Sequence, residues 1–252
     1  MRIIRVEHGG TSYYGILEDG LVFRLHQQPG HMEPIPLSEA KVLPLVTPSK
    51  VVCVGLNYKA HAEELGYPLP NMPSFFLKPP SSIIGNGEPI VLPSGMGRIE
   101  HEAELAMVVG KVCRNLTPEE AEESLFGFTC ANDVTAREVQ KVDPLIGHCK
   151  SYDTFCPIGP WIETELEDIN DLSIRCLVNG EVRQSANTGD MIFRPLDLLC
   201  FLSRVMTLMP GDVILTGTPP GISPIQADDV VQVSIEGIGT LSNPVEGPGP
   251  EE

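Results

Sequence analysis

The shortness of its apolar runs is the feature of this sequence that most constrains the fold. Gly and Pro, 24 of each in 252 residues, interrupt the chain every few positions, and both residues end regular structure. Most of the uninterrupted runs are short, rich in β-branched residues and bounded by turn residues, which is typical of strands. Few stretches have the length and periodicity of a helix. The pattern therefore predicts an α+β fold dominated by β-strands.

The first 48 residues have the character of a separate small β unit. Strand-like runs at 3–6, 13–17 and 21–25 are separated by short Gly-containing turns. A proline-rich stretch at 29–48 follows, and such a composition is typical of a linker. We therefore predict a small N-terminal β domain at 1–48 and a catalytic domain at 49–252.

Local signals place several elements in the second part of the chain. Residues 58–65 have helical character, 117–120 carry an N-terminal capping box, and 195–208 form the clearest amphipathic helix. A second capping box at 135–138 predicts that a helix starts directly after Asp133. The Asn179-Gly180 dipeptide predicts a tight β-hairpin.

The charge of the chain limits its partners. A formal net charge of −17 argues against nucleic acid, which needs a basic footprint, and against an anionic membrane surface. An acidic surface also keeps a protein soluble without any further role. An anionic substrate would need a local positive centre, which a bound cation with a few Lys and Arg residues could supply.

The cysteines and the apolar runs indicate the compartment. The seven Cys form an odd number, and no two have C-x-x-C spacing, so reduced thiols in a cytosolic protein fit best. The N-terminus lacks the apolar core of a signal peptide, and no run approaches the length needed to span a bilayer. We therefore expect a soluble, cytoplasmic protein.

Three carboxylates share one face of the predicted strand 98–109. Residues two apart in a strand point the same way, which groups Glu100, Glu102 and Glu104. Two such carboxylates, about 6.6 Å apart along a strand, can reach one hard cation. By itself this segment fits a solvated, polar strand end better than a metal site.

Asp133 strengthens the metal interpretation. It ends an apolar strand just before a predicted helix, and functional groups concentrate at such positions, although an Asp that only forms a turn is common. On the following helix, Arg137 and Gln140 are three residues apart and share a face. They would project toward whatever Asp133 contacts, and an Arg suits a planar carboxylate.

Further polar side chains are candidates for catalysis. If 58–65 is helical, His61 and Glu64 share a face, and a His held by a carboxylate is a usable general base; a lone structural His is the commoner case. Lys150 lies in a polar loop between a helix and a strand, where the alternative is an ordinary surface Lys. Thr218, in the turn after an apolar strand, could offer its hydroxyl to a carboxylate. P-loop, G-x-G-x-x-G, G-x-S-x-G and H-E-x-x-H motifs are absent from the sequence.

Several of these segments together resemble the fumarylacetoacetate hydrolase family, in particular its bacterial single-chain members. The resemblance spans about residues 51–221, and the short N-terminal region matches more loosely. The matching stretches occur in the order VVCVGLNYKAHAEEL, FFLKP, HEAELAMVVG, ANDVTAREVQ, KSYDTFCPIGPW, NTGDMIF and GDVILTGTPPG. The resemblance implies a mixed β-sandwich roll and a homodimer.

The resemblance also implies a site. It places Mg²⁺ or Mn²⁺, with Ca²⁺ as a further possibility, on Glu102, Glu104 and Asp133, and its register leaves Glu100 outside the ligands. It implies that His61 and Glu64 lie on a mobile lid helix and activate a water. It places Lys150 beside the metal, Arg137 and Gln140 near the substrate, and Thr218 at a substrate carboxylate. Lys78 matches the F-L-K-P segment, but the resemblance gives it no role.

Two departures from the family pattern concern substrate choice and loop shape. Acylpyruvate-cleaving relatives often have G-R-N-Y where this chain has Gly55-Leu56-Asn57-Tyr58. We expect the loss of that Arg to alter which substrate carboxylate is held. The segment 142–148, before Lys150, is also atypical.

Three hypotheses follow for the activity. In the first, a metal-dependent hydrolase cleaves a C–C bond of an acylpyruvate-type β-diketo acid through a chelated enolate, with His61 and Glu64 activating water and Lys150 steadying the oxyanion. In the second, the same chelation serves an oxaloacetate decarboxylase (a lyase) or a hydroxymuconate-type isomerase. In the third, the chain is a non-catalytic protein that binds a dicarboxylate. In each, the partner is a small acid.

Overall fold

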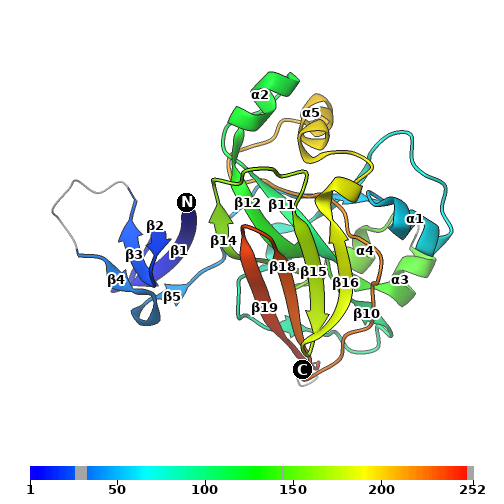
Figure 1. Ribbon diagram of the computed structural model, residues 1–252. Helices are drawn as coiled ribbons and strands as arrows, with labels where there is room; N and C mark the ends of the chain where they lie inside the picture. The colour runs from blue at the N-terminus through cyan, green and yellow to red at the C-terminus, as the bar shows by residue number, and fades with distance from the viewer. Residues whose placement is uncertain (26–32, 144, 249–252) are drawn as a thin grey trace.

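A computed structural model describes residues 1–25, 33–143 and 145–248 of the chain (Figure 1). Within these residues the dominant feature is a twelve-stranded sheet. Ten of its strands form a continuous path; β5 (Lys41–Val42) pairs with β1, and β8 (Ile83–Ile84) with β14. The path runs through β4 (Ile35–Pro36), β3 (Leu21–Arg24), β2 (Thr11–Glu18), β1 (Arg2–His8), β14 (Cys156–Glu163), β12 (Leu125–Asn132), β11 (Ala103–Val109), β17 (Val213–Leu215), β6 (Val51–Gly55) and β7 (Ser74–Lys78).

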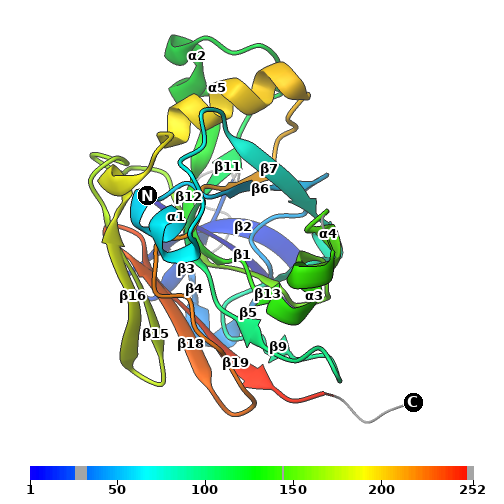
Figure 2. The same ribbon diagram turned by 90° about the vertical axis from the view of Figure 1, so that its right-hand side faces the viewer.

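A second sheet of five strands packs beside the first, and a short two-stranded ribbon lies near it (Figure 2). The second sheet runs β16 (Glu181–Asn187), β15 (Ser173–Val178), β18 (Val230–Ile235), β19 (Gly239–Glu246) and β9 (Ile90–Val91), and the ribbon pairs β10 (Ile99–Glu100) with β13 (Thr135–Ala136). The predicted α+β class with dominant strands is confirmed.

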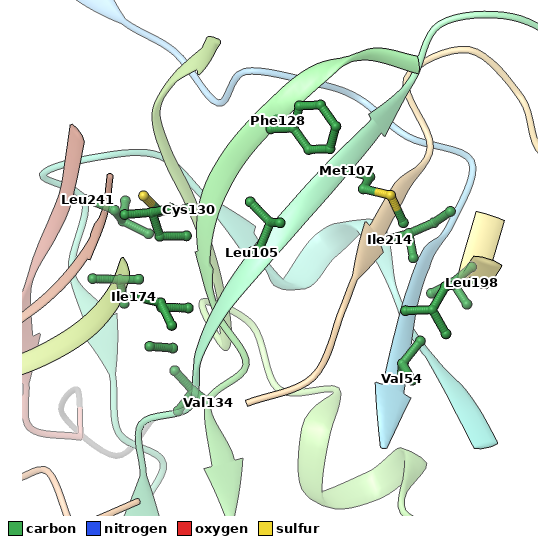
Figure 3. Packing of buried hydrophobic residues seen from close by; sticks show 14 of the residues in the cluster. Val54, Leu105, Met107, Phe128, Cys130, Val134, Ile174, Leu198, Ile214 and Leu241 are labelled. Atoms are coloured by element: carbon green, nitrogen blue, oxygen red, sulfur yellow. The ribbon is translucent and has the colours of Figure 1, made fainter. Parts of the chain in front are cut away.

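The core lies on both faces of the large sheet. All seven residues of β11 are buried, since this strand is central and covered on each side. Leu105 and Met107 pack into the cluster that faces the second sheet and α5 (Figure 3). Ala106 and Val108 pack into the other cluster, under the N-terminal strands. This two-sided burial explains why β11 is almost wholly apolar after Glu104.

The helices are short and lie at the ends of the sheets. They are α1 (Lys59–Leu65), α2 (Pro118–Glu123), α3 (Arg137–Val142), α4 (Gly147–Lys150) and α5 (Pro195–Val205), with 3₁₀ turns at Leu37–Glu39, Pro80–Ser82 and Thr188–Asp190. Figure 2 shows α2 and α5 together at one end of the molecule. No helix in the described parts of the chain is long and apolar enough to cross a membrane.

One of the two predicted capping boxes forms and the other does not. Thr117 caps α2 through the backbone N–H of Glu120, as predicted. The helix predicted directly after Asp133 instead begins at Arg137, because residues 135–136 first pair with β10. The Thr135 hydroxyl then donates to the carbonyl of Asp133 at 2.9 Å rather than capping a helix.

The N-terminal strands form as predicted, but the proline-rich stretch is more than a linker. Residues 35–36, 37–39 and 41–42 add β4, a 3₁₀ turn and β5 to the N-terminal unit, and residues 26–32 lie outside the described chain. Figure 1 shows this unit to one side of the main body. It joins the large sheet where β1 pairs with β14.

The predicted hairpin is confirmed between β15 and β16. Asn179 and Gly180 both have positive φ, 53° and 79°, as a type I′ turn requires. The hairpin carries Gln184, whose side chain reaches the loops beside the site described below.

Candidate metal centre

Three buried carboxylates meet where β11 begins and β12 ends. The two strands are antiparallel, with Ala103 opposite Asn132, so that Glu102, just before β11, lies beside Asp133, just after β12. The backbone N–H of Asp133 donates to the carbonyl of Glu102 at 2.8 Å. Carboxylate oxygens of Glu102, Glu104 and Asp133 all lie within 4.8 Å of one another, and all three residues are buried.

The predicted strand through 98–109 is interrupted, and this separates Glu100 from the other two glutamates. Glu100 belongs to β10, whereas β11 starts only at Ala103, so the prediction of one common strand face was wrong. Glu100 is fully enclosed and forms ion pairs with Arg98 and Arg137. It is not a member of the three-carboxylate group.

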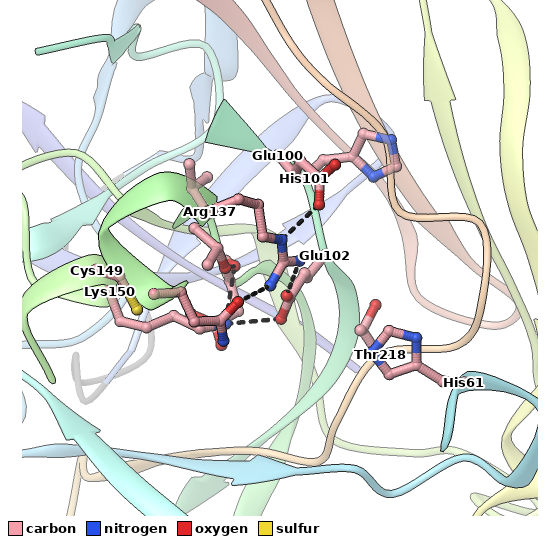
Figure 4. Close-up of polar contacts among 12 residues, drawn as sticks. His61, Glu100, His101, Glu102, Arg137, Cys149, Lys150 and Thr218 are labelled. Carbon is pink, nitrogen blue, oxygen red and sulfur yellow. Dashed lines mark hydrogen bonds and ion pairs between the residues drawn. The ribbon is translucent and has the colours of Figure 1, made fainter. Parts of the chain in front are cut away.

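Cations neutralise two of the three carboxylates. Lys150 Nζ lies 2.7 Å from Glu102 Oε2 and 2.6 Å from Asp133 Oδ2. Arg137 forms an ion pair with the other oxygen of Glu102 (Figure 4). Burial by itself would raise the pKa of Glu102, but Lys150 and Arg137 outweigh this effect and hold its pKa well below the usual range.

Glu104 is the carboxylate without a cationic partner among the described residues. It accepts a hydrogen bond from the backbone N–H of Gly217, and no ion pair to it forms in the described chain. Burial, with the neighbouring charges of Asp133 and Glu102, raises its pKa well above the usual value. Three buried carboxylates that offer only oxygen atoms, one of which (Glu104) has no cationic partner in the described chain, fit a hard divalent cation such as Mg²⁺ or Mn²⁺.

Lys150 is positioned by α4 and is almost completely buried. Its ammonium donates to Glu102, to the carboxylate of Asp133 and, at 3.5 Å, to the carbonyl of Asp133. Burial would lower the pKa of Lys150, but Asp133 and Glu102 raise it above its usual value. Lys150 is therefore a fixed positive charge in this structure, with its donors directed at the carboxylates.

His61 and Glu64 form the predicted pair on α1. His61 Nδ1 lies 2.9 Å from Glu64 Oε2. The second oxygen of Glu64 accepts from the backbone N–H of Gly221 at 3.0 Å, which ties the helix to the loop after β17. His61 is buried and lines the pocket. Figure 4 shows His61 and Thr218 together, across an open space from Glu102.

The three predicted substrate-binding residues also line the pocket. Arg137 donates to Gln140 at 2.8 Å, so the two share a face of α3 as predicted, but Arg137 is also paired with Glu100 and Glu102. The Thr218 hydroxyl donates to the carbonyl of Ala103 at 2.9 Å.

Two further residues organise the site and were not assigned a role from the sequence. Gln184, fully buried on β16, donates to Thr218 at 2.8 Å and accepts from the backbone N–H of Ala103 at 3.0 Å. Lys78, at the end of β7, forms a buried ion pair with Asp133. Gln184 lies in a strand between polar neighbours and carried no sequence signal; the F-L-K-P match was the only signal for Lys78.

The pocket has a volume of about 330 Å³ and two chemically different ends. The carboxylates, Lys150 and Arg137 form its polar end. Its remaining wall is largely apolar and is lined by Val54, Leu56, Leu65, Tyr67, Phe76 and Ile146. Leu56 and Ile146 both have positive φ, 53° and 62°, a strained conformation that is concentrated at functional sites.

Comparison with known families identifies the family of this chain. The family model described as fumarylacetoacetate (FAA) hydrolase C-terminal matches residues 50–246, and a model described as Rv2993c-like, N-terminal, matches residues 1–44. The chain belongs to the fumarylacetoacetate hydrolase family. Human mitochondrial oxaloacetate tautomerase FAHD2A is 42% identical to it over 84% of this chain and 71% of the human protein.

Solved structures extend the comparison. The crystal structure of 5-carboxymethyl-2-hydroxymuconate delta-isomerase from Mycobacterium smegmatis superposes with a TM-score of 0.91 at 42% identity, covering 99% of this chain and 100% of that one. Maleylpyruvate hydrolase from Sphingobium sp. SYK-6, solved with manganese(II) and pyruvate, gives a TM-score of 0.83 at 30% identity, covering 99% and 100%. The relatives are thus enzymes of more than one reaction type.

Proposed function

We propose that this protein is a divalent-metal-dependent enzyme that interconverts the enol and keto forms of a small 2-oxo acid. The observation that carries the proposal is the arrangement of the pocket: the His61–Glu64 pair lines it together with the three carboxylates Glu102, Glu104 and Asp133. The metal-binding carboxylates of such a pocket can hold the acid end of a substrate, while His61 on the other side transfers a proton.

The charge of the site supports an anionic ligand. Four buried carboxylates, those of Glu100, Glu102, Glu104 and Asp133, face three buried cations, Lys78, Arg137 and Lys150, and the half-exposed Arg98. With all of them ionised, a divalent cation would add two positive charges. A 2-oxo acid in its enolate form carries two negative charges, on its carboxylate and its enolate oxygen, and balances them.

Glu102, Glu104 and Asp133 would hold the metal. When bound, the ion supplies a Lewis acid for the carboxylate and 2-oxo oxygens of the substrate. Lys150 and Arg137 keep Glu102 ionised and oriented. Arg137 and Gln140 lie on the pocket wall, where they can contact the substrate carboxylate.

His61 would carry the proton. With Nδ1–H donated to Glu64, the Nε2 atom of His61 is free to take or give the proton at the substrate carbon next to the 2-oxo group. Glu64 holds the ring and is itself held by Gly221. Because His61 is buried, α1 also shields the reacting carbon from bulk water.

The contacts of Lys150 favour proton transfer over bond hydrolysis. Hydrolysis needs a donor for the developing oxyanion, and the Lys150 donors are directed at Glu102 and Asp133. The names of two relatives, an oxaloacetate tautomerase and a hydroxymuconate delta-isomerase, also support enol–keto chemistry.

Hydrolysis of an acylpyruvate is the second candidate. The His61–Glu64 pair can activate a water as readily as it can move a substrate proton, and the Sphingobium relative is a maleylpyruvate hydrolase. Decarboxylation of oxaloacetate needs the metal but no attacking water. A purely binding role is disfavoured because it leaves the His61–Glu64 pair without a purpose.

The test is a comparison of substrates on the Mg²⁺-loaded protein, with and without chelator. Freshly dissolved enol-oxaloacetate, acetylpyruvate and a hydroxymuconate analogue are supplied in turn, and loss of the enol absorbance and release of pyruvate are followed. We expect rapid, chelator-sensitive ketonisation that is lost in His61→Ala. Faster cleavage of acetylpyruvate than ketonisation would establish the hydrolase instead, and binding of oxalate without any turnover would establish a binding protein.

A further inference from the structure

Lys78 is a buried cation that does not line the substrate pocket. Its side chain is fully enclosed, and its ammonium pairs with Asp133 Oδ1 and donates to the carbonyl of Val134 at 3.2 Å. The lining of the pocket includes Phe76, two residues earlier on β7, and Lys150, but not Lys78. Lys78 therefore reaches the site from behind the carboxylates and cannot contact a substrate.

Asp133 is held from two directions by two different lysines. Lys78, on the edge strand β7, contacts Oδ1, whereas Lys150, on α4, contacts Oδ2 at 2.6 Å. Lys150 also donates to Glu102 and lies on the wall of the pocket. The Oδ2 oxygen is thus the one on the pocket side, and the Oδ1 oxygen is committed to Lys78.

Stability by itself does not account for this arrangement. An ion pair buried this deeply gains little over well-packed apolar side chains of the same volume, because both charges lose their hydration. The pair does orient the Asp133 carboxylate, because an ammonium held against one oxygen fixes the rotation of the group.

We propose that Lys78 is a positioning residue of the metal centre, which holds Oδ1 of Asp133 so that Oδ2 is presented to the divalent cation. The inference rests on the metal site of the proposed function but does not depend on which reaction is catalysed. Loss of a group that orients a metal ligand typically weakens metal binding by about 10- to 100-fold.

The experiment measures Mn²⁺ binding to the metal-free, full-length protein without substrate, by calorimetry and by the paramagnetic resonance spectrum of the bound ion. Lys78→Met removes both the charge and the donor, and we expect it to weaken Mn²⁺ binding by about 10- to 100-fold and to alter the spectrum. Lys78→Gln keeps a donor without the charge, and we expect a loss of several-fold. Lys141→Met, at an exposed Lys paired with Glu138 on α3, is the matched control and should bind as the wild type does.

Thermal unfolding of each variant separates positioning from a general effect on folding. A folded Lys78→Met that binds Mn²⁺ as tightly as the wild type, or more tightly, with an unchanged spectrum, overturns the inference. If that variant does not fold, Lys78→Gln decides in the same way, and wild-type affinity and spectrum overturn the inference. Failure of the wild type to bind Mn²⁺ would instead refute the metal site on which the proposed function depends.

Discussion

Two buried carboxylate sites of this protein, at Asp212 and at Glu104, have opposite surroundings. Asp212, just before β17, is fully enclosed and accepts hydrogen bonds from the backbone N–H and the hydroxyl of Ser49. It also accepts from the backbone N–H groups of Lys50 and Met209, and it forms an ion pair with the Lys50 side chain. Glu104, on the neighbouring strand β11, accepts from the backbone of Gly217 and has no ion pair within the described chain.

The difference separates a structural carboxylate from a functional one. Burial raises the pKa of both groups, but at Asp212 the hydrogen bonds from Lys50, Met209 and Ser49 outweigh it and lower the pKa. At Glu104 the charges of Asp133 and Glu102 act in the same direction as burial, and the pKa is raised. Asp212 is satisfied by the chain itself, whereas Glu104 needs positive charge from outside it.

The largest expected effect is on catalysis, when the functional carboxylate Glu104 is changed. Glu104→Gln keeps the shape of the side chain but removes the charge that a cation requires, so we expect catalytic efficiency to fall on the order of 10³-fold, the scale of losing a group that stabilises developing charge. Because an uncompensated buried charge is also removed, the free energy of unfolding should stay the same or rise. Steady-state kinetics and urea unfolding measure the two; a variant that keeps its activity would contradict the assignment.

The next effect concerns the proton carrier rather than the metal ligands. His61→Ala should lower kcat by about 10²-fold or more, as expected for loss of a general base, while Mn²⁺ binding stays within about twofold of wild type, since His61 is outside the carboxylate group. Kinetics and calorimetry on one preparation measure kcat and the Mn²⁺ affinity. Equal loss of Mn²⁺ affinity and of rate would mean that His61 supports the metal centre instead.

Asp212→Asn tests the contribution of the structural carboxylate to stability. The amide cannot accept all of the hydrogen bonds that the carboxylate accepts and loses the ion pair with Lys50. We expect the free energy of unfolding to fall by about 2–3 kcal/mol, as for hydrogen bonds to a charged group. Activity per folded molecule should not change. A change in activity without a change in urea midpoint would reverse the roles of the two carboxylates.

The smallest effect is a pH dependence of stability that distinguishes Asp212 from Glu104, because the pKa of Glu104 is shifted in the opposite direction. Because the pKa of Asp212 is depressed in the folded protein, its stabilisation is fully present above its unfolded pKa, near 3.8, and is lost as the pH falls through the lower folded value. The difference in unfolding free energy between wild type and Asp212→Asn should therefore be constant from pH 7 to pH 5 and shrink below about pH 4. Urea unfolding at several pH values measures it, and a difference that grows on acidification would refute the sign.

Elements specified by neighbouring residues could be predicted from the sequence. The capping box at Thr117 and the hairpin at Asn179-Gly180 form because their hydrogen bonds and dihedral angles are local. The equivalent box at Thr135 fails because a distant segment, β10, pairs with residues 135–136 first. Local chemistry therefore predicts an element only where no tertiary partner competes for the same backbone groups.

The residues of the candidate site also divide into those that local sequence could predict and those that it could not. Glu102, Glu104 and Asp133 could be found because their spacing and the strand end suggested a cation, and the family resemblance supplied the register. The break before β11 that removes Glu100 from their face could not be found, since Glu100 pairs instead with the distant strand β13 and with Arg137. Gln184 is brought to the site by long-range packing of β16 and has no local signature.

The central claim is that the three carboxylates hold a cation that enol–keto proton transfer requires. The most direct measurement titrates Mn²⁺ into the metal-free wild-type protein while the decay of enol-oxaloacetate is followed by ultraviolet absorbance. We expect negligible catalysed decay without metal and a rise in rate that saturates at one Mn²⁺ per chain. Full catalysis in the presence of excess chelator, or saturation with no gain in rate, would contradict it.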